Sequence, residues 1–148
     1  TSEEHYSAAV LWAPAAGDGS SSMVDFLGGE DAYELLRAQA EESGYAVLET
    51  PWGATQHLSL TWFTDMESSK PQSAVAEYEG ALLVLYGSDD EVVASRFGKA
   101  VVTSATKSGP VEEHIVEGGS HGLGFYDDDD EMATQVVSRT TRFLKDNL

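Results

Sequence analysis

The chain has no cysteine and few basic residues, and these two absences bound its chemistry before any motif is considered. Without cysteine it has neither disulfide bonds nor thiolate metal ligands. Its eight lysines and arginines face 26 aspartates and glutamates, which gives a formal net charge of −18. A field of this sign repels nucleic acids and anionic membranes, so we expect neither as a partner.

Long hydrophobic runs are also missing. No apolar run approaches the roughly 20 residues that a membrane-spanning helix requires. No basic, apolar secretory leader opens the sequence, so we expect a cytoplasmic protein. With 148 residues and 41% hydrophobic content, the chain is long enough for one globular domain with its own core.

The pattern of apolar residues predicts an α/β fold. The segment 81–86 is a continuous apolar run, which is typical of a parallel strand buried on both faces by helices. Strand, helix, strand and helix then follow one another in the second half of the chain, the order of a parallel crossover unit. Predicted strands cover 7–13, 45–50, 81–86 and 111–116, and predicted helices cover 30–43, 55–66, 92–107 and the C-terminal segment after the acidic run.

Two of these strands end in glycine and a side chain that can take part in catalysis. The strand over 81–86 leads to the pair Asp89 and Asp90, and the strand over 111–116 leads to a glycine-rich turn with His121. Parallel strands deliver such groups to one edge of a sheet, and neighbouring strands lie about 4.8 Å apart. We therefore expect a carboxylate of this pair to contact the imidazole. Taken alone, an aspartate at 89 or 90 is also typical of a helix N-cap. A histidine in a glycine-rich loop is also typical of a side chain that is simply solvated.

On these motifs the chain resembles the C-terminal half of an α/β-hydrolase, in particular the carboxylesterase and feruloyl-esterase-like branch. This resemblance implies a single domain over 1–148, a partial α/β-hydrolase fold with about three parallel strands, flanking helices and a helical cap insertion at about 15–78. The matching stretches are VLWAPA at 10–15, LLVLYGSDDEVV at 82–93, VEGGSHG at 116–122 and RFL at 142–144.

The resemblance implies serine-hydrolase-type cleavage of a small carboxylic ester, without a cofactor or a metal. Asp90 takes the place of the triad acid, with Asp89 as the nearby alternative, and His121 takes the place of the triad histidine. The family's nucleophile elbow and oxyanion loop precede the first matching strand, so they would lie upstream of Thr1. The stretch 118–122 matches Gly-x-Ser-x-Gly, but it holds the histidine and opens no helix, so we do not expect Ser120 to be the nucleophile.

An alternative function follows from this missing serine. The chain is then a non-catalytic or partner-dependent module, because half of a parallel sheet leaves an apolar edge strand exposed to pairing. We expect it to form a homodimer or to bind a complementary N-terminal half that carries the serine. A third interpretation is a minimal esterase that recruits one of its own serines, although the serines at 20–22 have no better claim than Ser120.

Two further clusters have ordinary interpretations. The run Asp127–Asp130 lacks the glycine-bearing spacing of a calcium loop and suits the positive N-terminal end of a helix. Trp52, Trp62 and Phe63 either line an apolar pocket for the acyl group or pack the core of the cap.

Acidic residues spread along the whole chain, with only four lysines, indicate a surface adapted to concentrated salt. Dissolved ions screen the repulsion between like charges. We therefore expect the melting temperature to rise when KCl or NaCl is increased to molar concentrations. A melting temperature that stays constant or falls would indicate an ordinary acidic cytosolic protein that is not adapted to salt.

Overall fold

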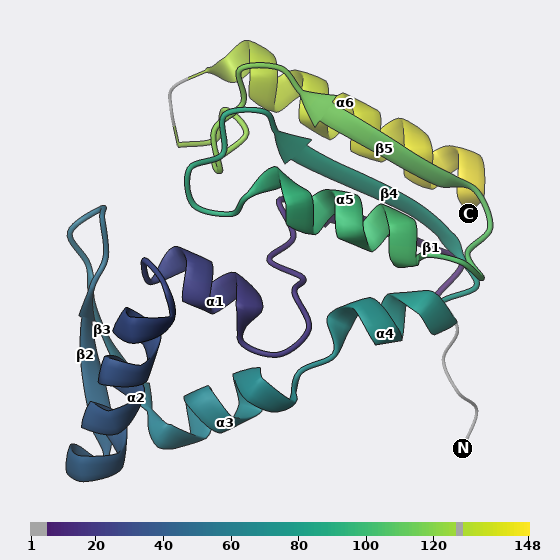
Figure 1. The fold of residues 1–148 in the computed structure, drawn as a ribbon. Helices are drawn as coiled ribbons and strands as arrows, with labels where there is room; N and C mark the ends of the chain where they lie inside the picture. Colours follow the sequence, from purple (N-terminus) through teal and green to yellow (C-terminus); the bar gives the residue numbers. More distant parts are fainter. Residues whose placement is uncertain (1–5, 127–128) are drawn as a thin grey trace. The chain divides into compact units, whose positions relative to one another are not determined.

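The computed structural model describes residues 6–126 and 129–148, and the chain divides into two compact units (Figure 1). The sheet unit consists of the chain up to Ala16 and from Pro71 onward, and the insert unit consists of Gly17–Lys70. Helix α4 (Pro71–Glu77), which falls within the expected cap at about 15–78, belongs to the sheet unit. That the insert unit acts as a cap stays a prediction.

The sheet unit contains three parallel strands, as the sequence predicts. They are β1 (Ala8–Trp12), β4 (Ala81–Gly87) and β5 (Val111–Val116), in the order β1-β4-β5. All seven residues of the central strand β4 are buried. In the register of β4 with β5, Gly87 lies opposite Val116, so the two strands end at the same level.

Helices cover both faces of this sheet because side chains of β4 alternate between two apolar clusters (Figure 1). Leu83 and Leu85 pack against α6 (Asp130–Asn147), and the other side of the strand packs against α5 (Ser95–Ser104). The first cluster includes Ala81, Val116, Leu123, Val136 and Phe143; the second includes Leu82, Val84, Tyr86, Val101 and Ala105. The result is an α/β fold with a parallel sheet between helices.

The start of α6 agrees with the interpretation of the acidic run as a helix N-terminus. The Asp129 carboxylate accepts a hydrogen bond from the Met132 amide at 3.0 Å, and Asp130 and Glu131 occupy the first turn. The other two aspartates of the run, at 127 and 128, lie outside the described residues. Within 6–126 and 129–148, no group of three or more histidine, aspartate or glutamate side chains is arranged to hold a metal ion.

The insert unit combines helices with a hairpin. Its elements are α1 (Ser21–Phe26), α2 (Glu30–Ser43), β2 (Tyr45–Glu49), β3 (Thr55–Ser59) and α3 (Leu60–Ser68), and β2 pairs with β3 antiparallel. Its separate core consists of Tyr33, Ala40, Ala46, Leu58 and Phe63. Phe63 is fully buried there, so this residue packs a core and lines no pocket.

The helix predicted over 55–66 is wrong in its first part, because 55–59 form strand β3. The segment between the strands is a hairpin turn, in which the Thr50 hydroxyl accepts from the Ala54 amide at 2.9 Å. Helix α3 begins only after Ser59, whose hydroxyl accepts from the Trp62 amide at 3.2 Å. The short helices α1 and α4 fall in segments where no helix was predicted from the sequence.

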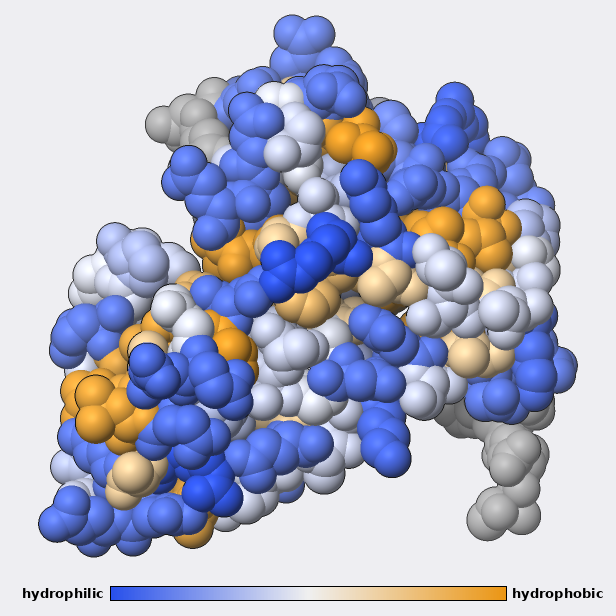
Figure 2. All heavy atoms as spheres, in the orientation of Figure 1, coloured by the Kyte–Doolittle hydropathy of each residue, from blue (hydrophilic) through white to orange (hydrophobic). Residues whose placement is uncertain are grey.

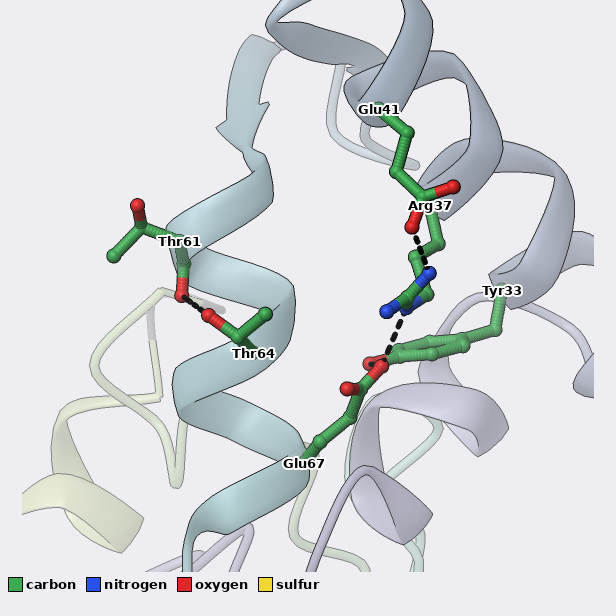
Figure 3. Close-up of polar contacts among 6 residues, drawn as sticks. All are labelled: Tyr33, Arg37, Glu41, Thr61, Thr64 and Glu67. Carbon is green, nitrogen blue, oxygen red and sulfur yellow. Dashed lines mark hydrogen bonds and ion pairs between the residues drawn. The ribbon is translucent and has the colours of Figure 1, made fainter.

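A polar network joins α2 to α3 in the insert unit (Figure 3). Arg37 Nε donates to Glu67 Oε1 at 2.7 Å, and the same guanidinium pairs with Glu41 one helical turn away. The Tyr33 hydroxyl also donates to Glu67, at 3.4 Å. The two glutamates raise the pKa of Arg37, chiefly through their hydrogen bonds. Because these charges lie near the solvent, the network adds little to the free energy of unfolding. Its main effect is to hold α2 and α3 together.

Hydrophilic residues cover most of the visible surface, with scattered apolar patches (Figure 2). One apolar exposure belongs to β1: the Trp12 side chain is 42% exposed and stacks on Phe125 with ring centroids 5.3 Å apart. Its indole nitrogen donates to the Thr140 hydroxyl at 2.9 Å. No helix in the described part of the chain is long and apolar enough to cross a bilayer.

Candidate active site

The carboxylate of Asp90 is held rigidly in the turn after β4. Its Oδ1 atom accepts hydrogen bonds from the amides of Val92, at 2.9 Å, and Val93, at 2.8 Å. Only 1% of the side chain is exposed. One oxygen thus orders the turn that precedes α5. The N-cap of α5 is Ala94, so Asp90 does not cap the helix itself. The other oxygen remains for a different partner.

That partner is His121, from the turn after β5. The Nδ1 atom of the imidazole lies 3.0 Å from Asp90 Oδ2, so the contact predicted from the sequence is present. The His121 side chain is 37% exposed, and it makes no other polar contact with the described residues. Because Nδ1 is engaged by the carboxylate, Nε2 is the ring nitrogen left for a reacting group.

The two loops approach closely because a glycine ends β4. The Ser88 amide donates to the Val116 carbonyl, and the Asp89 amide donates to the Gly119 carbonyl, both at 3.0 Å. A Cβ atom at position 87 would lie 1.9 Å from the Gly119 carbonyl oxygen, so no residue with a side chain fits here without movement. The histidine loop turns at Gly118, whose φ of 69° favours glycine.

The two adjacent aspartates, Asp89 and Asp90, have different surroundings. Asp89 is exposed, and its Oδ1 accepts from the Ser88 hydroxyl at 2.7 Å. Asp90 is the aspartate that contacts the imidazole. No role for Ser88 was predicted from the sequence. Its position between the strand-ending glycine and two aspartates was the signal available.

The hydrogen bond described for His121 is made with Asp90 and with no serine of the described residues. Ser120 accepts from the Gly122 amide at 3.3 Å, and the serines at 20–22 belong to the insert unit. The other histidine of the sheet unit, His114 on β5, is in a different setting. Burial, with Arg139 and Arg142 nearby, lowers the pKa of His114, so the neutral imidazole is favoured there.

The remaining aromatic candidates stay in the insert unit. The Trp62 ring contacts Phe63 edge-on, with centroids 4.9 Å apart, and belongs to the core of that unit. Trp52 is 58% exposed at the hairpin turn and lies 6.0 Å from the Phe26 ring. A pocket for an acyl group is thus not formed by Phe63, and a role for Trp52 in binding stays a prediction.

Comparisons with known proteins support the fold. The structure is similar to Est1E from Butyrivibrio proteoclasticus, with a TM-score of 0.54 and 14% identity over 91% of this chain and 52% of that one. It is also similar to the alpha/beta hydrolase GrgF from Penicillium sp. sh18, with a TM-score of 0.55 and 13% identity over 95% of this chain and 55% of that one. No protein-family model and no curated protein matches the sequence.

The protein therefore has a partial α/β-hydrolase fold. It spans about half the length of the solved structures that it matches. At this low sequence identity the similarity concerns the fold, and what the site does must be argued from its own residues.

The close approach of the two loops predicts the effect of Gly87→Ala. The added methyl group collides with the Gly119 carbonyl, so we expect a loss of about 1–3 kcal/mol in the free energy of unfolding, the usual cost of overpacking. Gly109→Ala is the matched control, because its Cβ would meet only ordinary contacts at 3.7 Å and beyond. Urea denaturation measures both, and equal stability of the two variants would contradict the packing described for Gly87.

Proposed function

We propose that Asp90 and His121 are the acid and the base of a serine-hydrolase-type reaction on carboxylic esters. One observation carries this proposal: a buried carboxylate holds Nδ1 of a partly exposed imidazole at 3.0 Å, at the carboxyl end of neighbouring parallel strands. Ligands and reactive groups of open α/β sheets collect at this edge. The partial α/β-hydrolase fold is consistent with the same chemistry.

In this mechanism the Asp90 carboxylate accepts a hydrogen bond from Nδ1–H and thereby holds the tautomer in which the Nε2 lone pair is free. His121 Nε2 takes the proton of a serine hydroxyl as that oxygen attacks the ester carbonyl, and Asp90 stabilises the imidazolium that forms. The proton then passes from Nε2 to the departing alcohol. Water repeats the sequence on the acyl-serine and releases the acid. This chain's own residues hold and move the proton, and they require no cofactor.

The nucleophile is proposed to come from a strand that pairs with β1. Within the described residues β1 pairs only with β4, so its outer edge has free backbone groups. The strand is uncharged, and Trp12 at its end is 42% exposed. An apolar edge without charged residues is prone to pairing. The proposed occupant that supplies the nucleophile is a complementary half that carries the serine, whereas a second copy of the chain would pair with this edge without supplying one.

Substitutions at the two residues test the catalytic proposal. In the protein purified from its source, we expect His121→Ala to lower hydrolysis of a p-nitrophenyl ester by about 10³-fold or more, and Asp90→Asn to lower it strongly as well. His57→Gln, on the exposed face of the β2–β3 hairpin, is the matched control and should keep full activity.

Two results would refute this proposal. Ester hydrolysis that survives His121→Ala would remove the imidazole from the reaction. A purified chain that is monomeric, reacts with a fluorophosphonate probe and loses hydrolysis on His121→Ala would contradict the part of the proposal that brings the serine from a partner. We expect the chain alone to show no labelling.

Light scattering tests the pairing of β1. In molar salt, where the charge of −18 on each chain is screened, we expect a mass above that of the monomer. Trp12→Lys should return the protein to a monomer, because a charge at the end of the edge strand opposes pairing. Ile115→Lys, at a similarly exposed position on β5, is the control and should not. A monomer under all salt conditions would contradict self-pairing.

A further inference from the structure

Ser88 connects the acid loop to the histidine loop through its side chain. Its hydroxyl accepts a hydrogen bond from the Gly118 amide at 2.8 Å and donates one to Asp89 Oδ1 at 2.7 Å. Its own amide donates to the Val116 carbonyl at 3.0 Å. One residue of the acid loop therefore contacts both the last residue of β5 and the turn that carries the imidazole.

The direction of these two hydroxyl bonds matters. Because the hydroxyl proton points to the Asp89 carboxylate, a lone pair of the oxygen remains for the Gly118 amide. Gly118 adopts a φ of 69° and precedes His121 by three residues, so this bond fixes the turn from which the imidazole projects. The same pair of bonds keeps one Asp89 oxygen engaged.

We propose that Ser88 is a positioning residue: it holds the histidine turn against the acid loop and thereby directs His121 to Asp90, leaving Asp89 outside the pair. This inference rests on the proposed function, because it assigns a role within the same site. Ser88 does not act on the substrate or on the reacting atoms. Its hydroxyl acts through the backbone of the histidine loop.

This role can be separated from general folding. The other hydrogen bonds between the loops that precede the imidazole use backbone atoms, from the amides of Ser88 and Asp89 to the carbonyls of Val116 and Gly119. These bonds do not use the Ser88 side chain, so Ser88→Ala leaves their donors and acceptors in place. Ser88 is also exposed, so Ser88→Ala removes the two hydroxyl bonds without opening a cavity in the core.

Nuclear magnetic resonance of the labelled chain measures the effect directly. Long-range ¹H–¹⁵N spectra report which ring nitrogen of His121 carries the proton, and we expect Nδ1–H in the native chain. In Ser88→Ala we expect the Gly118 amide to exchange about five- to tenfold faster, the factor that corresponds to one hydrogen bond. We also expect a mixture of the two His121 tautomers. Ser88→Thr, which keeps the hydroxyl, should restore the native spectrum.

Two further variants serve as controls for Ser88→Ala. Asp90→Asn removes the carboxylate from the imidazole and should change the tautomer without affecting Gly118 exchange. Asp89→Asn keeps an acceptor for the hydroxyl and should leave both readouts unchanged. Native tautomer and exchange in Ser88→Ala, or the same change in Ser88→Thr as in Ser88→Ala, would overturn the inference.

These readouts do not depend on activity. If Ser88→Ala gives the expected tautomer shift, but ester hydrolysis by the protein purified from its source survives His121→Ala, the proposed function is refuted and the positioning role remains intact. Conversely, an active enzyme in which Ser88→Ala changes neither the tautomer nor Gly118 exchange would refute only the positioning role.

Discussion

The pairing of β4 with β5 is the constraint from which the candidate site follows. Both strands run in the same direction and end at the same level, with Gly87 opposite Val116. The two loops therefore begin side by side, one carrying Asp90 and the other His121. Since Gly87 has no side chain, the Gly119 carbonyl can occupy the space where a Cβ atom would lie. A shift of this register by one residue would separate the carboxylate from the imidazole.

Asp90 shows that a structural role in ordering a turn and a proposed catalytic role need not exclude each other. Its two oxygens have different partners: Oδ1 accepts hydrogen bonds from two backbone amides, and Oδ2 faces the imidazole. The first interaction fixes the orientation of the second. The contrast in exposure, 1% for Asp90 and 37% for His121, fits a pair in which a buried carboxylate orients a ring that can still meet a substrate.

The sequence predicted the sheet well because parallel strands buried on both faces are continuous apolar runs. The predicted strand over 111–116 coincides with β5, and the order of elements after residue 80 matches the structure. The helix prediction over 55–66 failed because apolar residues spaced four apart continue from a strand into a helix. Leu58 belongs to β3 and Trp62 to α3, so their spacing did not reflect one helix.

The finer geometry of the site could not be predicted from the sequence, for a different reason. Asp89 and Asp90 follow the same strand, and only the path of the turn decides which carboxylate reaches the amides of the next turn and the imidazole. The bond between Ser88 and Gly118 likewise exists only because the register brings two loops together that are 30 positions apart. Such contacts depend on three-dimensional pairing and leave no periodic signal.

A crystal structure of the chain measures the central contact most directly. We expect Asp90 Oδ2 and His121 Nδ1 to lie within hydrogen-bonding distance, near 3.0 Å, with Nε2 facing solvent or a bound ester. Side chains that point to opposite sides of the sheet, or an imidazole paired with Asp89 instead, would contradict it.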